Sequence, residues 1–390
     1  MISNSNLITL AKDTVDNSDI DRLCEWLKTY PRLTKGPVTI AFEQQWAKWL
    51  GTKYAVFVNS GSSANLLMLY ALIASGKLKS KKIAVPALSW ATDLAPVMQL
   101  GLEPVLVDCN LQNLSVDVEH LEIIFKQHKP DALMLVSVLG LVPDMDAILE
   151  LCKKYEVIVL EDVCESFGSK HKDIKLGTLG LMSSFSMFFG HHLSTIEGGM
   201  VCTNDKEMYN ILKMIRSHGW DRDLDSDTQK QLRTNWEIDD FNSLYSFYVP
   251  GFNVRSTDLQ AYIGIGQLEK ADTIVSNRNK NYKMFTDLVK NDYWKPNVHA
   301  DAFVSNFCYP VIHPNRDAIV NKLKANNVEV RPLICGSMGT QPFYVKEYGR
   351  TELKNVSIVD KNGIYVPNNP LLTDSEIKLI CDIINSETNK

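Results

Sequence analysis

Several polar residues near the middle of the chain have types and spacing suited to acid–base chemistry. Glu161 and Asp162 follow the apolar stretch 157–160, so we expect both carboxylates at the end of a strand. The carboxyl ends of parallel strands form the usual ligand edge of an open α/β sheet. His191 and His192 come later in the chain, and an imidazole moves protons at neutral pH because its ordinary pKa is about 6.5. Taken alone, the two acids also fit a solvated turn, and a histidine is more often structural than catalytic.

Small and hydroxyl-bearing residues in two segments are suited to an anion. The segment 59–65, NSGSSAN, follows an expected strand and opens an expected helix. Backbone N–H groups at such a helix N-terminus attract anions. A simple helix cap by Ser62 or Ser63 explains the same pattern. Ser184 and Ser186 have hydroxyls that could bind a phosphate or face water on a strand.

Other side chains are candidates only in combination. Adjacent histidines rarely point at one ion, and no nearby cysteine, histidine or aspartate cluster completes a metal site, so we predict no metal here. Trp90 follows a strand end and could stack on a flat ring, or belong to the core. Arg255, in the segment 250–255 (PGFNVR), and Arg331 have the charged fork that suits carboxylates and phosphates. Each arginine alone is more typical of a protein surface.

Alternating strands and helices must position these residues. Short apolar strands between helices predict an α/β fold with a mainly parallel sheet covered on both faces. The expected strands are 54–58, 83–86, 103–107, 133–138 and 157–160, and the expected helices between them are 62–74, 93–100 and 145–155.

The length of 390 residues suits one large domain and a smaller one. We expect an N-terminal segment 1–36, a large domain 37–270 and a small C-terminal α+β domain 271–390. The polar segment 222–247 is expected to be an irregular surface excursion. The small domain is expected to contain strands near 307–311 and 328–331 and helices at 317–325 and 375–386.

Composition excludes several classes of protein. The chain is 45% hydrophobic and 22% charged with a net charge of -5, which argues against a nucleic-acid or anionic-membrane partner. The longest apolar run, 132–142, is too short to span a bilayer, and no secretory signal is visible, so we predict a cytoplasmic protein. Cys152 and Cys164 are the closest cysteines and lie twelve residues apart, which argues against an iron–sulfur cluster.

Together, these segments resemble the fold type I, aspartate-aminotransferase-like enzymes of the DegT/DnrJ/EryC type, which use pyridoxal phosphate (PLP) to modify nucleotide-linked sugars. The matching segments, in family order, are 59–65, 85–86 with Trp90, 161–162, 184–186, 197–199, 218–219, 250–255 and 331–332. Aminotransferases of this family hold PLP on a lysine six residues before the glutamate of the Glu-Gly-Gly segment. Here that position is His191, and no lysine occurs from residue 176 to 205.

A histidine pair in place of that lysine resembles the sugar C3-dehydratases of the family. One branch carries an iron–sulfur cluster, whose closely spaced cysteines are absent here, and the other needs no metal. The resemblance therefore implies non-covalent PLP or pyridoxamine phosphate (PMP) and no iron–sulfur cluster. It implies L-glutamate and a GDP-linked 4-keto-6-deoxy sugar as substrates, either a hexose such as GDP-4-keto-6-deoxymannose or a heptose homologue. The products would be a 3-deoxy sugar for a surface polysaccharide, 2-oxoglutarate and ammonia.

The resemblance also implies a role for each matching residue around the cofactor ring. His191 is the acid and base of the reaction because it occupies the lysine position. Trp90 stacks on the ring, Asp162 pairs with the pyridine nitrogen, and Glu165 lines the site.

The remaining implied roles concern the phosphate and the substrate. Gly61, Ser62 and Ser186 bind the cofactor phosphate, and Asn253 reaches it from the partner subunit of a homodimer. The substrate-binding residues are Arg331, Arg255 and His218.

Two alternatives stay open at this point. The first is a nucleotide-sugar aminotransferase with its lysine elsewhere, whose product would retain nitrogen. The second is a catalytically inactive homologue that binds a sugar nucleotide, which would neither bind PLP tightly nor change its spectrum with glutamate.

Overall fold

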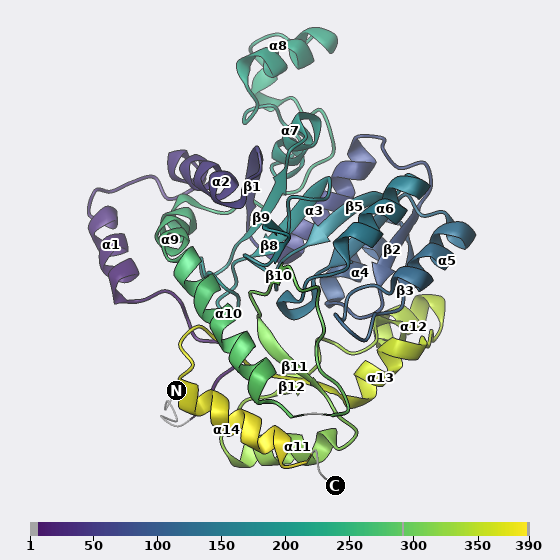
Figure 1. Ribbon diagram of the computed structural model, residues 1–390. Helices are drawn as coiled ribbons and strands as arrows, with labels where there is room; N and C mark the ends of the chain where they lie inside the picture. The colour runs from purple at the N-terminus through teal and green to yellow at the C-terminus, as the bar shows by residue number, and fades with distance from the viewer. Residues whose placement is uncertain (1–6, 291, 388–390) are drawn as a thin grey trace.

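The computed structural model describes residues 7–290 and 292–387. Figure 1 shows a large α/β layer, a smaller body beneath it and an arm above it. Helix α10, Ala271–Leu288, runs from the large layer to the smaller body (Figure 1). No described helix has both the length and the apolar character needed to cross a membrane.

A seven-stranded sheet in the order β1-β9-β8-β5-β4-β2-β3 forms the centre of the large layer. Neighbouring strands from β8 to β3 are parallel, and β9 is antiparallel to both of its neighbours. This confirms the prediction of a mainly parallel sheet. The strands are β1 Tyr54–Val58, β2 Lys82–Pro86, β3 Glu103–Val107, β4 Ala132–Val136, β5 Ile158–Asp162, β8 Met182–Ser186 and β9 Gly199–Thr203.

Helices bury this sheet. All five residues of β4 are buried, which requires cover on both faces because successive side chains point to opposite sides. Helix α3 packs on α4, on α7 and on the sheet, whereas α5 packs on α6 and α2 on α9. These helices are α2 Pro37–Leu50, α3 Gly61–Ala74, α4 Ala91–Gln99, α5 Val118–His128, α6 Met145–Tyr155, α7 Lys206–Ile215 and α9 Asp258–Glu269. Helix α1, Asn17–Leu27, packs against α9.

The smaller body is built on a three-stranded antiparallel sheet, β11-β13-β12. The strands are β11 Cys308–Ile312, β12 Arg331–Pro332 and β13 Gly363–Pro367, and the helices after α10 are α11 Arg316–Ala325, α12 Pro342–Tyr348, α13 Lys354–Asn362 and α14 Asp374–Asn385. A third sheet joins β10 Ala302–Phe303, β6 Lys170–His171 and β7 Ile174–Lys175.

Two local predictions need correction. The strand expected at 328–331 is wrong, because Val328 forms only an isolated bridge with Ile8, and the strand begins at Arg331. The segment 222–247 is an excursion, as predicted, but it is not irregular. It contains the helix α8, Ser226–Asn235. Asp225 caps the N-terminus of this helix by accepting a hydrogen bond from the Thr228 N–H. This helix has no buried residue, so it lacks the apolar periodicity that identifies a helix in a sequence.

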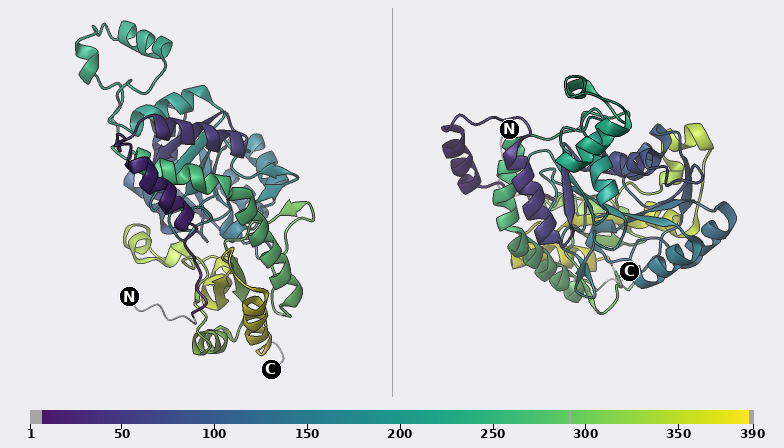
Figure 2. Two further views of the ribbon diagram at one scale, coloured as in Figure 1. Left: turned by 90° about the vertical axis from the view of Figure 1, so that its left-hand side faces the viewer. Right: turned by 90° about the horizontal axis from the view of Figure 1, so that it is seen from above.

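The segment carrying α8 projects from the body in every view (Figures 1 and 2). After α8, a 3-10 turn at Asn242–Tyr245 leads the chain back. Large apolar side chains are exposed along this arm, which we define as residues 222–247, among them Trp236, Phe241 and Tyr245.

Candidate active site

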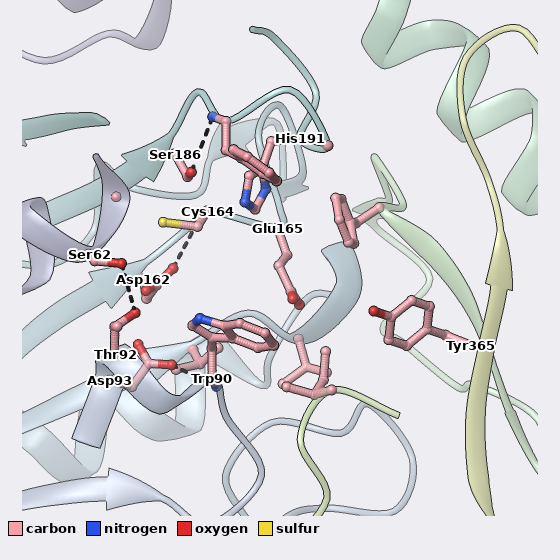
Figure 3. Close-up of a pocket in the computed structure, with 17 residues that line it drawn as sticks. Ser62, Trp90, Thr92, Asp93, Asp162, Cys164, Glu165, Ser186, His191 and Tyr365 are labelled. Atoms are coloured by element: carbon pink, nitrogen blue, oxygen red, sulfur yellow. Dashed lines mark hydrogen bonds between the residues drawn. The ribbon is translucent and has the colours of Figure 1, made fainter. Parts of the chain in front are cut away.

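A cavity of about 260 Å³ lies where three parallel strands of the large sheet end. Val136, Asp162 and Ser186 end β4, β5 and β8 and line it. The predicted site residues that line this one cavity are Gly61, Ser62, Trp90, Asp162, Glu165, Ser186 and His191. Figure 3 shows His191 and Trp90 on opposite sides, with Asp162 and Ser186 along one wall. The sheet edge therefore gathers residues that are up to 130 positions apart in the sequence.

His191 lies in the loop between β8 and β9, with its ring 5.2 Å from that of Phe307. Burial lowers the pKa of His191 to about 4, and the charge of Arg278 adds to the effect, while Asp162 opposes it. The ring is therefore neutral at neutral pH. A hydrogen bond with the Cys164 backbone contributes at the ring, and Nδ1 is buried with no partner among the described residues. One ring nitrogen is thus available to take a proton.

His192 has a different environment from its neighbour. Its Nε2 lies 3.1 Å from the Ser305 carbonyl oxygen, and the residue is not part of the cavity wall. The two histidines therefore turn to different partners.

Asp162 is held in one orientation at the end of β5. Asn65 Nδ2 donates to Asp162 Oδ2 at 2.6 Å, and the Cys164 N–H donates to Oδ1 at 2.8 Å. Its neighbour Glu161 does not line the cavity. Instead, Glu161 accepts backbone N–H groups of the loop 177–180 and is structural.

The first turn of α3 offers donors to an anion. Ser60 caps the helix by accepting from the Ser63 N–H at 3.1 Å, so the N–H groups of Gly61 and Ser62 have no partner within the helix. A Cβ added at Gly61 would lie 2.7 Å from Ser186 Cβ and 3.0 Å from Cys164 Sγ, so only glycine fits there. Ser62 Oγ donates to Thr92 Oγ1 at 3.4 Å (Figure 3). N–H groups and hydroxyls from several elements thus converge at one corner of the cavity.

Glu165 lies between His191 and Trp90 in Figure 3. Its Oε2 accepts from the Leu139 N–H at 2.8 Å. Burial raises the pKa of Glu165 to about 8, and the charge of Asp162 adds to the rise. Glu165 is therefore mainly protonated at neutral pH and can donate a hydrogen bond.

Four predicted residues do not line this cavity within the single chain. Arg255 Nε donates to Asn253 Oδ1 at 3.0 Å, and Arg255 Nη2 lies 3.4 Å from His218 Nε2, so these three form a separate cluster. Arg331 is exposed and pairs with Glu329. The roles suggested for these four residues stay predictions.

The structure adds residues, in the cavity wall or hydrogen-bonded directly behind it, that sequence reasoning missed. Asn65 lies inside the segment 59–65, yet it had no role in the prediction. Asp93 could have been noticed as an acid three positions after Trp90 in the first turn of an expected helix. Phe307 and Tyr365 reach the cavity from the smaller body. A local sequence pattern cannot predict such a contact between distant segments.

A protein-family comparison and relatives of known name agree on the class of this chain. The model of the DegT/DnrJ/EryC1/StrS aminotransferase family matches residues 14–385. GDP-4-keto-6-deoxy-D-mannose 3-dehydratase of Yersinia pseudotuberculosis is 33% identical, covering 96% of this chain and 97% of that protein. The enzyme of the same name from Escherichia coli O55:H7 is 35% identical, covering 90% and 92%.

A solved structure of GDP-4-keto-6-deoxymannose-3-dehydratase with a trapped PLP-glutamate geminal diamine superimposes with a TM-score of 0.88. The two chains are 32% identical, and the match covers 97% of this chain and 100% of the other. The likeness confirms the predicted fold type I architecture.

Proposed function

This chain belongs to the DegT/DnrJ/EryC1/StrS aminotransferase family, and on that premise we propose that it is a PMP-dependent 3-dehydratase. Its sugar substrate is a GDP-linked 4-keto-6-deoxy hexose, such as GDP-4-keto-6-deoxymannose, or a heptose homologue. L-Glutamate supplies the amino group of PMP and leaves as 2-oxoglutarate. The C3 hydroxyl of the sugar is lost, and ammonia is released. The observation that carries the proposal is His191 in a cavity where none of the described lining residues is a lysine.

The cavity residues fit PLP or PMP. The Gly61 and Ser62 N–H groups, with Ser186, suit the phosphate because a helix N-terminus favours an anion. Asp162, already oriented by Asn65, suits a protonated ring nitrogen. Trp90 provides a flat face. When bound, PMP supplies an amino group and an electron sink.

The lining chemistry supports non-covalent binding and a reaction without an iron–sulfur cluster. A histidine cannot form the covalent link that a lysine forms. Cys164 is the one cysteine among the described lining residues, whereas such clusters draw several ligands from cysteine side chains.

His191 moves the protons of the reaction. Its neutral ring takes a proton at the free Nδ1, and the resulting imidazolium donates that proton to the departing C3 hydroxyl. Burial makes the imidazolium unfavourable, so the proton is readily passed on. Glu165, protonated at neutral pH, lines the same cavity as His191 and can donate a hydrogen bond there.

The proposal includes a homodimer with shared sites. Asn253, Arg255 and His218 cluster away from the cavity of their own chain. Such a position suits residues that contribute to the active site of a partner subunit. Trp236, Phe241 and Tyr245 of the arm are exposed in the single chain, and large exposed apolar groups on one segment are typical of an interface. Asn253 would then reach the cofactor phosphate of the partner.

The first test is to mix the purified protein with PLP, L-glutamate and GDP-4-keto-6-deoxymannose and to measure the mass of the nucleotide sugar. Loss of the C3 oxygen together with free ammonia is the expected result. A product that retains nitrogen would make the protein an aminotransferase. A protein that leaves both the sugar and the PLP spectrum unchanged would be an inactive homologue. PMP formation with an unchanged sugar would direct the search to heptose substrates.

A further inference from the structure

One buried acid at the cavity has no part in the function proposed above. Asp93 lies in the first turn of α4, is 1% exposed, and lines the cavity beside Asp162. Its Oδ2 accepts from the Trp90 N–H at 3.0 Å. This bond alone would make Asp93 an ordinary helix-capping residue.

The Asn65 amide links Asp93 to Asp162. Asn65 Nδ2 lies 3.2 Å from Asp93 Oδ1, 2.6 Å from Asp162 Oδ2 and 3.2 Å from the Thr92 carbonyl oxygen. One amide nitrogen has two hydrogens, so it cannot serve three acceptors fully. Asn65 is itself 1% exposed, and its Oδ1 is buried without a partner among the described residues.

A proton on Asp93 resolves the shortage of hydrogen-bond donors around these two acids. Two carboxylates that share a buried site do not both ionise readily. A protonated Asp93 removes the like charge and adds the missing donor, directed to Asp162 or to the amide oxygen of Asn65. Asp162 accepts from Asn65 Nδ2 and from the Cys164 N–H.

We propose that Asp93 is a positioning residue that retains a proton at neutral pH and, with Asn65, fixes the orientation of Asp162. The inference rests on the proposed function only in taking Asp162 as the partner of the cofactor ring nitrogen. A neutral Asp93 adds no second negative charge beside the ring nitrogen.

The surroundings of Asp93 support a retained proton. Burial raises the pKa of Asp93 well above its ordinary value, and the charge of Asp162 is the next largest cause. The charge of Glu165, in the turn after β5, acts in the same direction only at the higher pH at which Glu165 is itself ionised. The other titratable groups near the pair are the thiols of Cys164 and Cys335 and the ring of His191. Burial keeps both thiols and the imidazole neutral at neutral pH.

The first test uses the cofactor-free protein. In wild type, Asp93 ionises on unfolding, because its pKa is raised only in the folded state. The folded state then binds more protons, so its stability falls as pH rises above about 4. Asp93→Asn removes this dependence. We therefore expect the urea midpoint of Asp93→Asn, relative to wild type, to rise between about pH 5 and pH 8.

A matched control is Asp205→Asn, which alters the cap of α7 at the Met208 N–H. The difference in urea midpoint between Asp205→Asn and wild type should stay constant between about pH 5 and pH 8. A flat difference for Asp93→Asn as well would mean that Asp93 is ionised in the folded state, and the proposal would be wrong. This measurement does not depend on the reaction, so it separates failure of this inference from failure of the proposed function.

The second test measures PMP binding by wild type, Asp93→Asn and Asp93→Ala. The asparagine imitates the neutral acid and should bind PMP within about twofold of wild type. The alanine loses the link to Asp162 and should bind roughly tenfold more weakly, the effect of one lost hydrogen bond to a charged group. The pH profile of absorption by bound PMP should follow wild type in Asp93→Asn and shift in Asp93→Ala.

Two outcomes of the binding test would overturn the positioning role. Equal losses for asparagine and alanine would show that the charge of Asp93 is required. Unchanged affinity and spectrum in both variants would leave Asp93 as a helix cap only. If Asp93→Ala fails to fold, the asparagine variant and the urea series still decide the question.

Discussion

At the residue scale, the proposed chemistry depends on the histidine at position 191. The side chain lies in a cavity with Asp162 and Trp90, where a lysine amine would compete for the cofactor. An imidazole can exchange protons there without bonding to the cofactor carbon. The neighbouring His192, fully buried and directed at Ser305, shows that the type of residue alone does not confer this role.

His191→Lys should bind PLP covalently and lose dehydration. The amine would replace the proton shuttle, and loss of general acid–base catalysis typically costs 10²–10⁴-fold in rate, so we expect a fall of at least about 100-fold. Borohydride reduction followed by intact-protein mass reports the covalent link, and product mass reports dehydration. His191→Asn is the control, since it should lose rate without the link. Dehydration at the parent rate in His191→Lys would disprove the role of His191.

His191 also makes the stability of the cofactor-free chain depend on pH. Its pKa is lowered to about 4 in the folded state, against about 6.5 when unfolded. The unfolded state therefore binds more protons between these values, and stability falls as pH drops from about 6.5 to about 4. His191→Asn should remove at most about 3 kcal/mol of that fall. Urea unfolding of both proteins at several pH values measures it, and parallel curves would contradict the expectation.

At the element scale, the proposed phosphate site depends on the close approach of the start of α3 to the end of β8. Ser60 caps the helix, while Gly61 lets Ser186 and Cys164 come near the free N–H groups. The first turn of α4 lies beside that of α3, where Thr92 Oγ1 accepts from Ser62 Oγ at 3.4 Å, and it brings Trp90 and Asp93 to the cavity. Binding groups therefore come from helix N-termini that face one sheet edge.

Gly61→Ala should weaken PLP binding at least about fivefold, because the added methyl group would lie 2.7 Å from Ser186 Cβ and overpacking costs about 1–3 kcal/mol. Equilibrium binding followed by PLP absorbance measures the effect. Gly190→Ala is a matched control in the same cavity wall, since its nearest contact would be an ordinary 3.6 Å to Phe188. Equal affinities of the two variants would contradict a tight cradle at Gly61.

At the scale of the whole molecule, the smaller body completes the cavity. Arg278 donates to the Phe307 and Asn368 carbonyl oxygens at 2.7 and 2.8 Å, which ties α10 to the segment that carries Phe307. Asp108, just after β3, accepts from the Asn355 and Val356 N–H groups at 2.8 Å each. It thereby caps α13 from the large layer and joins the two bodies.

Asp108→Ala should lower the free energy of unfolding by about 2–4 kcal/mol, because two donors at the start of α13 lose a partner. Urea denaturation measures the loss. Asp144→Ala is the control, since Asp144 precedes α6 and makes no capping hydrogen bond. A loss no larger than that of the control would show that Asp108 does not join the bodies.

Subunit mixing tests the proposed homodimer with shared sites. His191→Asn and Asn253→Ala should each be impaired alone. A mixed dimer holds one site with both native residues, so activity should recover after the two variants are unfolded and refolded together. Absence of recovery, with mixed dimers confirmed by mass, would place His191 and Asn253 in one chain's site.

Much of the fold follows from local sequence patterns. The strands 54–58 and 103–107 and the helix 145–155 match the predicted bounds, because apolar spacing and flanking caps specify such elements locally. Asp162 and His191 were identified for the same reason: each stands at a position that the strand pattern or the family spacing marks. The helix α8 was missed because a capped but fully exposed helix has no apolar face.

What only the tertiary structure decided concerns partners that lie far apart in the chain. Asn65, Asp93 and Asp162 meet because β5 pairs beside β4 and β8 while α3 and α4 both point at that edge. Phe307 and Tyr365 close the cavity only after the smaller body docks. Local patterns report which face of an element is apolar. The orientation of Asp162 and the separation of His191 from His192 depend on which elements finally pack together, and that is settled by the burial and hydrogen bonding of the whole chain.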